Sequence, residues 1–248
     1  MPYSAKTNWR NNDIVTPDDL NRIEQGLADV ASPKDDIILY VSAAGDDNTG
    51  TGDMNSPFRT VQKAIDALPP CNALGKACVI KIYEGEFAGF TLSAFKQIDV
   101  VVQGIVQFKG DIIINSGSMT FVDETDAQVY LIDARLYMNG GKLTSFIPIG
   151  ITTSAQSSQY NGIAINCANG SIFGVHADTT ITHHTTAISC SHSYINLKRM
   201  LTDQTSTGIV CECGITQLGD DVIQASTKFV TRDGGRIYVG AQTNVPNY

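Results

Sequence analysis

A repeat with a period of just over twenty residues constrains the fold of this chain more than any other feature. Six segments share a small residue followed closely by an apolar one, and successive copies lie 24, 29, 23, 21 and 21 residues apart. The small residues are Gly117, Gly141, Gly170, Ser193, Gly214 and Gly235. Short apolar runs with a turn at a fixed offset are typical of a solenoid, in which each repeat packs on its neighbours. Leucine-rich repeats have a similar period, but their regular framework of Leu and Asn is absent here.

The repeat also predicts which side chains point inward. We expect one apolar residue per turn to form an interior column, and the candidates are Met119, Leu143, Ile172, Ile195, Ile215 and Ile237. Three cysteines, Cys167, Cys190 and Cys211, recur at one place in successive turns. Neighbouring parallel strands lie about 4.8 Å apart, so these thiols would stack, and we interpret them as packing groups because free cysteine behaves as a small hydrophobe. Two earlier apolar runs, at 79–83 and 98–102, bring the expected total to roughly seven to nine turns.

The stretch YVSAAGDDNTGTGDMNSPFRTVQKAIDALPP predicts how the solenoid begins. An apolar run at 37–41 is followed by a loop rich in Gly, Asp and Asn, which favour turns. Ser56 and Pro57 suit the start of a helix, as a cap and a first-turn residue. We therefore expect an amphipathic helix over 57–68, ended by the two prolines that follow it.

This strand, loop and short helix resemble the lead-in of the pectate-lyase-like right-handed parallel β-helix family. The resemblance implies an all-β fold, a right-handed parallel β-helix, with the short helix capping its open end. Such a cap is needed because the first turn of a stack would otherwise expose its apolar core and unpaired edge. Of the polygalacturonase motifs, only Asp220-Asp221 is a partial match to D-D, and neither G-H-G nor R-I-K follows it. The resemblance is therefore to the scaffold, and neither the polygalacturonase nor the pectate-lyase active site is implied.

Residues 1–36 are predicted to form a separate segment with its own helix. Thr16 suits an N-cap, and Pro17 suits the first helical position. Apolar residues recur at steps of three, four and three, at Leu20, Ile23, Leu27 and Val30. This seam is too short to be stable alone, and it suits packing against identical chains, so we expect a homotrimer. The alternative is an amphipathic helix docked on its own domain.

This segment resembles the N-terminus of virion fibre and tail proteins of bacteriophages, especially those infecting Gram-positive hosts. The resemblance lies in the motifs N-W and N-D-I-V-T-P-D-D-L-N-R-I-E-Q-G. The resemblance implies that residues 1–36 attach the protein to other virion proteins or to a preceding trimeric segment. Residues 37–248 would then be the β-helix domain, exposed on the virion surface. The N-terminus lacks the apolar stretch of a secretory signal, so synthesis in the bacterial cytoplasm is expected.

Charge and hydropathy exclude several classes of partner. The net charge is −8, and no cluster of Lys and Arg is available to neutralise phosphates, which argues against nucleic acid as a partner. This charge is compatible with neutral or amino-sugar glycans. No apolar run reaches the roughly 18 residues that a membrane-spanning helix needs, so no membrane insertion is expected.

The sequence predicts no metal site and no cofactor. Cys211-Glu-Cys213 lacks a second pair of metal-ligand type, and His183-His184 lacks an assignable third ligand. Cys71 and Cys78 flank a turn-like segment and could form a disulfide, although proteins made in a cytoplasm usually keep their thiols reduced.

Candidate catalytic residues follow from the same repeat. Counting six residues past the small residue gives His176, Arg199 and Asp220 in successive turns, with Asp178 nearby. Carboxylates on alternate turns would lie about 9.6 Å apart, which is at the upper range for an inverting glycosidase. Asp220, Asp178 and Arg199 are therefore candidates for catalysis, and the alternative is a surface ion pair between Arg199 and Asp220 beside an unrelated histidine.

Together these features predict a trimeric phage fibre or tail-spike-type protein that binds a host cell-surface glycan. Gln159, Tyr160, His176 and Arg199 are the candidate binding residues, the first two in a polar insertion that makes one repeat longer. One alternative is a depolymerase on the same scaffold, either a hydrolase or a lyase acting on host polysaccharide. The other is a purely structural virion decoration.

Overall fold

The computed structural model describes residues 15–31, 36–69, 77–154 and 162–239, without the side chains of 25–31, 204, 206 and 220–226. The chain forms a right-handed parallel β-solenoid in which 63% of the residues are in strands, and the described residues contain only two short helices. The solenoid has about seven turns, at the lower end of the expected range. The predicted all-β parallel β-helix is thereby confirmed.

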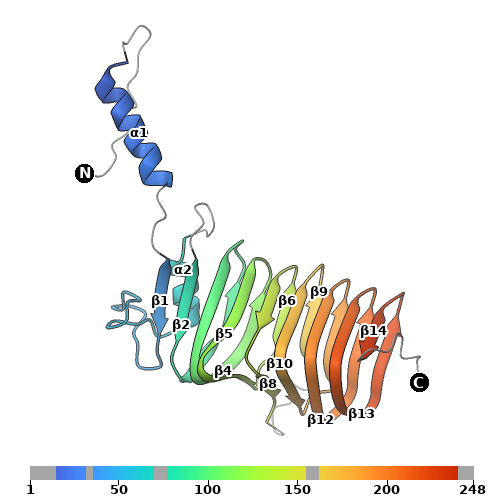
Figure 1. Ribbon diagram of the computed structural model, residues 1–248. Helices are drawn as coiled ribbons and strands as arrows, with labels where there is room; N and C mark the ends of the chain where they lie inside the picture. The colour runs from blue at the N-terminus through green and yellow to red at the C-terminus, as the bar shows by residue number, and fades with distance from the viewer. Residues whose placement is uncertain (1–14, 32–35, 70–76, 155–161, 240–248) are drawn as a thin grey trace.

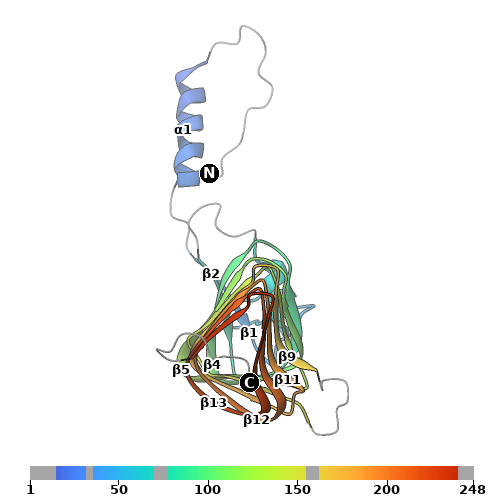
Figure 2. The same ribbon diagram turned by 90° about the vertical axis from the view of Figure 1, so that its right-hand side faces the viewer.

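The strands stack into three faces that give a roughly triangular outline when viewed end-on (Figures 1 and 2). The first face contains β1 (Ile37–Val41), β2 (Cys78–Ile82), β7 (Lys142–Ser145), β14 (Arg236–Val239) and the first parts of β4 (Gln97–Ile114), β5 (Ser118–Ile132), β10 (Ile172–Thr182), β12 (Tyr194–Glu212) and β13 (Ile215–Arg232). The second face adds β3 (Gly85–Leu92) and β8 (Ile149–Thr152) to the later parts of β4, β5, β10, β12 and β13. The third face contains β6 (Leu136–Asn139), β9 (Ile163–Ala168), β11 (Thr186–Ser191) and the last parts of β3, β4, β12 and β13. All pairings between these strands are parallel, as expected when each turn stacks on the one before it.

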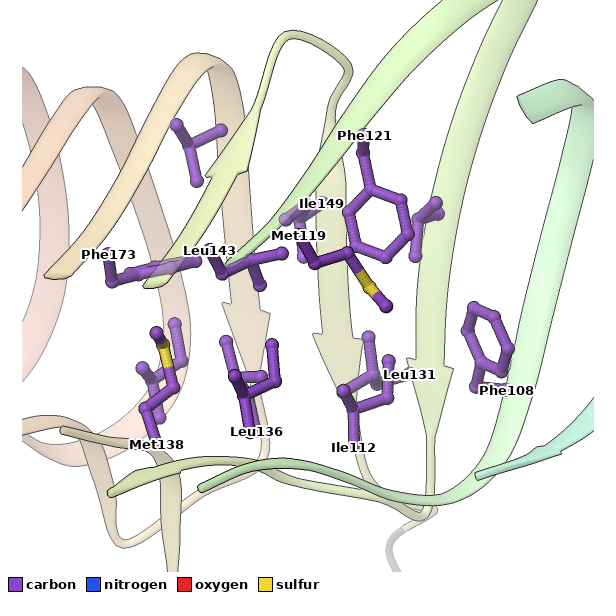
Figure 3. Packing of buried hydrophobic residues seen from close by; sticks show 14 of the residues in the cluster. Phe108, Ile112, Met119, Phe121, Leu131, Leu136, Met138, Leu143, Ile149 and Phe173 are labelled. Atoms are coloured by element: carbon purple, nitrogen blue, oxygen red, sulfur yellow. The ribbon is translucent and has the colours of Figure 1, made fainter. Parts of the chain in front are cut away.

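Buried side chains form columns through the interior, because successive residues of a strand point to opposite faces. On the third face, Cys167 pairs in register with Cys190, and Cys190 pairs with Cys211. All three are at most 1% exposed, so the predicted cysteine column is confirmed. Figure 3 shows other parts of the same interior, which larger apolar side chains such as Phe108, Phe121 and Phe173 fill.

Two members of the predicted inward column are wrong. Ile172 and Ile215 are 43% and 38% exposed, whereas their neighbours Phe173 and Thr216 are fully buried in register with the rest of the column. A one-residue error exchanges the two faces of a strand. For the third repeat the small residue that aligns with the others is Ser171, one residue later than predicted. Ile215 directly follows its small residue, whereas column members lie two residues after theirs.

The capping helix is present but begins later than predicted. It is α2 (Val61–Ala67), and its N-cap is Thr60, whose side chain accepts a hydrogen bond from the amide of Lys63. Ser56 is therefore not the cap. The reason is the carboxylate of Asp47, which accepts hydrogen bonds from the amides of Arg59 and Thr60 and from the Thr60 hydroxyl, and so holds this segment extended up to Thr60.

Helix α2 is fixed to the first turns of the solenoid at both its side and its end. Val61, Ala64 and Ile65 are buried against the core. The Lys96 ammonium donates to the carbonyl oxygens of Ile65 and Leu68, both at 2.6 Å, which satisfies acceptors that a helix C-terminus leaves unpaired. The helix therefore covers apolar residues of the first turns, as a cap requires.

Helix α1 (Pro17–Ala31) begins where the sequence predicted. The Thr16 hydroxyl accepts from the Asp19 amide at 3.2 Å, and the Asp19 carboxylate accepts from the Thr16 amide at 3.1 Å, which forms a reciprocal capping box. Leu20 and Ile23 are 52% and 41% exposed, and the helix lies apart from the solenoid (Figure 1). The side chains of the other two seam residues, Leu27 and Val30, lie outside the described part, so the trimer remains a prediction.

Two further findings bear on the sequence predictions. Cys78 is disulfide-bonded, and the partner considered for it, Cys71, lies outside the described residues. Neither described helix combines the length and the apolar character that crossing a membrane would require.

Candidate functional site

A groove of about 430 Å³ runs across three successive turns, at the corner where the third face passes into the first. Each turn contributes three consecutive residues. The lining residues are Gly170, Ser171 and Ile172 from one turn, His192, Ser193 and Tyr194 from the next, and Cys213, Gly214 and Ile215 from the third. The groove therefore repeats with the spacing of the turns, about 4.8 Å.

The corner is built from left-handed backbone. His192 and Cys213 have φ values of 49° and 50°, and Gly170 has a φ of 80°. A residue in this region reverses the chain sharply between two strands. Parallel hydrogen bonding continues through the corner, since the amide of Gly170 donates to the carbonyl of His192 at 2.9 Å. The three turns are consequently held in line.

Small residues form the floor of the groove because the corner leaves little room. A Cβ at Gly214 would lie 2.7 Å from the Cys190 sulfur and 2.9 Å from the Ser193 carbonyl oxygen. At the equivalent position Ser171 is fully buried and donates its hydroxyl to the carbonyl of Ala168. The small residue that defines the sequence repeat therefore produces a continuous depression along the corner.

The two walls of the groove differ in chemistry. One wall is the exterior row Ile172, Tyr194 and Ile215, which pair in register on adjacent strands. The other wall carries the exposed side chains of His192 and Cys213. Polar groups border both walls, because the Tyr194 hydroxyl donates to the side-chain oxygen of Gln217, and the Cys213 thiol donates to the carbonyl of Asp233 at 2.9 Å.

The predicted catalytic residues lie elsewhere on the surface. The backbone ladder aligns Asp178, Arg199 and Asp220 on three adjacent strands. Arg199 forms an ion pair with Asp178 at 3.4 Å, with both side chains almost half exposed, and the side chain of Asp220 lies outside the described part. Arg199 is five residues beyond Tyr194 along β12, which corresponds to about 16 Å of strand. The ion pair and the groove are therefore separate features.

The predicted alignment of His176 with Arg199 is wrong. A β-bulge in β10 between Val175 and Asp178 adds a residue, and Asp178 takes the position opposite Arg199. His176 instead stacks on Phe146, with ring centroids 4.9 Å apart and planes 12° apart. Phe146 is 54% exposed, so the two rings form an aromatic platform on the surface.

Two predicted binding residues cannot be placed, and the residues of the groove were not predicted. Gln159 and Tyr160 lie outside the described residues. The groove residues Tyr194, His192 and Cys213 were not predicted as a site, although the recurring small residue and the apolar residue after it mark the corner in the sequence. Within the described ranges, no group of three or more His, Cys, Asp or Glu side chains is arranged to hold a metal ion.

Searches against protein-family profiles, curated proteins and solved structures returned no match for this chain.

Proposed function

We propose that this chain is a bacteriophage virion fibre or tail-spike-type protein that binds a glycan of the host cell surface. The observation that carries the binding part is the groove over Ile172, Tyr194 and Ile215. The assignment to a virion rests on the N-terminal segment and its resemblance to phage fibre proteins. The solenoid then serves as the shaft and presents the binding face.

The groove suits a linear, neutral polysaccharide. None of its lining residues carries a permanent charge, which favours an uncharged ligand over an anionic one. An extended glycan chain advances by close to the spacing of one turn per sugar, so each turn can present the same wall to the next ring. The apolar wall offers a surface for the C–H faces of sugars, while the exposed side chain of Gln217 beside Tyr194 supplies hydrogen bonds.

Trimer formation would raise the apparent affinity for a glycan chain through avidity, even if each single groove binds weakly. Leu20 and Ile23 remain exposed on α1, and an apolar seam on a short helix needs a partner to bury it. Three identical chains would satisfy this requirement and would place three grooves on one rigid body. Simultaneous engagement raises the apparent affinity without any new contact. The same segment would link the trimer to other virion proteins.

Replacing Tyr194 by Ala tests the groove directly. We expect binding to a glycan array of host wall and capsule polysaccharides to weaken at least about tenfold, equivalent to ~1.4 kcal/mol. The matched control is Tyr137→Ala on the third face, where Tyr137 stacks under the Arg135 guanidinium instead of lining the groove. Equal binding by both variants and the unmodified protein would refute the groove as the site, and no binding of any glycan would favour a structural decoration.

A depolymerase is the second candidate, because Asp178, Arg199 and Asp220 are aligned on adjacent strands. Positions on alternate strands lie about 9.6 Å apart, and inverting glycosidases separate their two carboxylates by up to about 9.5 Å. If this reading holds, incubation shortens the polymer, and Asp178→Asn or Asp220→Asn abolishes the shortening. A polymer that keeps its length in the presence of the protein would exclude this candidate.

A further inference from the structure

The first face carries the exposed aromatic platform at the edge opposite the groove. Phe146 directly follows β7, and His176 directly follows Val175 on β10. The ladder pairs Ser145 with Val175, so the next residues, Phe146 and His176, lie side by side on neighbouring turns. Their ring centroids are 4.9 Å apart, which matches the spacing of about 4.8 Å between neighbouring strands. The two rings therefore stack along the axis of the solenoid.

The stacked rings leave part of their faces uncovered. Their planes are only 12° apart and their centroids are 4.9 Å apart. Carbon atoms in contact lie about 3.5–4.0 Å apart, so the rings must be displaced sideways by about 3 Å. This is the offset stacking that aromatic pairs prefer. Phe146 is 54% exposed and His176 is exposed as well, so apolar ring surface is open to a ligand.

The bulge in β10 places a pair of opposite charges beside the platform. Between the buried residues Val175 and Thr179, β10 has three residues, whereas β12 has only two between their register partners. Asp178 follows His176 by two residues, which is about 6.6 Å along an extended strand. Asp178 also forms the ion pair with Arg199 on the next turn. The bulge therefore brings the two rings and the ion pair to one corner of the solenoid.

The ion pair keeps most of its capacity for hydrogen bonds. Asp178 and Arg199 meet through one oxygen and one nitrogen, Oδ2 and Nη2, at 3.4 Å, and the two side chains are 42% and 45% exposed. A guanidinium has several N–H donors and a carboxylate has several acceptor sites, so both groups can also bind neighbouring hydroxyls of a sugar. The opposite charges balance each other, which favours a neutral ligand.

We propose that Phe146, His176, Asp178 and Arg199 form a second sugar-binding site for a neutral pyranose of the glucose or N-acetylglucosamine type. The substituents of these sugars are equatorial, so C–H bonds cover the ring faces and rest on the aromatic platform. Hydroxyls at the ring edge then bind the carboxylate of Asp178 and the guanidinium of Arg199. An apolar surface with a few convergent polar groups is the usual composition of a ligand site. This site extends the proposed glycan binding, on which it rests.

The second site and the groove bind separate segments of one polymer. Ile172 in the groove wall and His176 in the platform are four residues apart on β10, which corresponds to about 13 Å of strand. The groove crosses three turns at one edge of the first face, and the platform lies at the other edge. Each chain thus holds a long polysaccharide at two points, which raises the apparent affinity through avidity.

The test titrates the full chain with cellotetraose and with chitotetraose, which are neutral β-linked tetramers of glucose and of N-acetylglucosamine. NMR follows the imidazole signals of the four histidines, and the variants His176→Asn and His192→Asn identify two of them. His176 reports on the platform, and His192 reports on the groove. We expect at least one tetramer to shift the His176 signals until they reach a plateau.

Two variants and a matched control connect this signal to the proposed contacts. Phe146→Ala removes one ring of the platform and should weaken the binding measured at His176 at least about fivefold. Arg199→Lys should weaken it by a similar factor, because a lysine lacks the planar fork of donors. The control is Phe95→Ala, since Phe95 is 89% exposed but lies in the turn before β4, at the opposite edge of the first face. It should leave the binding unchanged.

Far-ultraviolet circular dichroism establishes that each variant is folded, as the exposure of Phe146 leads us to expect. The proposal is overturned if neither tetramer shifts the His176 signals, or if Phe146→Ala binds as tightly as Phe95→Ala. A shift of His192 alone, lost in Tyr194→Ala, would leave the groove standing and remove the second site. A shift of His176 alone, weakened by Phe146→Ala, would support the second site and count against the groove.

Discussion

Exchanging the neighbours Ile172 and Phe173 for Ala, one at a time, tests the strand register that defines both core and groove. Phe173 is fully buried, and Phe→Ala in a protein core typically costs about 3–5 kcal/mol. Ile172 is 43% exposed, so somewhat more than half of its three lost carbons leaves a buried environment. At about 0.8 kcal/mol per buried carbon this gives about 1.4 kcal/mol, with little cavity cost at the surface. The costs of the two substitutions should therefore differ by about 1.6–3.6 kcal/mol.

Equilibrium urea unfolding followed by far-ultraviolet circular dichroism measures both free energies of unfolding. The comparison is valid if the slope with denaturant stays the same in both variants, because a changed slope would indicate a changed unfolded state. A cost for Ile172→Ala that equals or exceeds the cost for Phe173→Ala would refute the register. In that case the groove wall would have to be rebuilt from different residues.

Three further predictions follow from contacts elsewhere in the chain. Lys96→Met removes the ammonium that caps α2 and should lower the free energy of unfolding by about 1–3 kcal/mol. The control Lys109→Met breaks only an exposed ion pair with Glu86 and should lower it by at most about 1 kcal/mol. Equal losses in the two variants would refute the cap. Asp47→Ala leaves the amides before α2 without their acceptor, so amide exchange of Val61–Ala67 should accelerate, and unchanged protection would contradict the role of Asp47. The pKa of Cys167 is raised from 9.0 to about 12, so folding favours its protonated form and this stabilisation is intact below pH 9 and lost as the pH rises towards 12. The stability advantage of the unmodified protein over Cys167→Ala should therefore narrow by roughly 1.4 kcal/mol per pH unit above pH 9 in urea titrations, and a constant difference would exclude this linkage.

The solenoid and its cysteine column could be predicted because residues one period apart in the sequence lie next to each other on stacked turns. Cys167, Cys190 and Cys211 recur at nearly equal steps, and each step is one turn, so equal offsets become neighbouring positions on parallel strands. The start of α1 was likewise predictable, since its capping box is local to Thr16 and Asp19. Local and periodic signals of this kind do not depend on the rest of the fold.

Positions that depend on a single residue of register were not predictable. The bulge between Val175 and Asp178 shifts β10 against β12, and no turn residue marks it in the sequence, so His176 was aligned with the wrong partner. The start of α2 depends on Asp47, which lies thirteen residues before Thr60 in the sequence. Its carboxylate accepts hydrogen bonds from Arg59 and Thr60 and so keeps the residues directly before α2 out of the helix. A tertiary contact overrides local helix signals in such a case.

The groove was not predicted as a site because its chemistry is distributed over three turns. No turn alone contains more than three lining residues, and each of these triplets reads as an ordinary corner. Only stacking brings Ile172, Tyr194 and Ile215 into one row. The sequence therefore marks the corner of each turn by its small residue, but the groove forms only when the turns stack in the solenoid.

One measurement tests the central claim, a trimeric glycan-binding fibre, most directly. The full-length protein is mixed with purified surface polysaccharide of the host, and both are sized by chromatography with light scattering. The account predicts a particle of three chains, each of 26.6 kDa, that co-elutes with polymer of unchanged length. A monomer, or a trimer that elutes apart from every polysaccharide offered, would contradict it, and shortened polymer would establish the depolymerase instead.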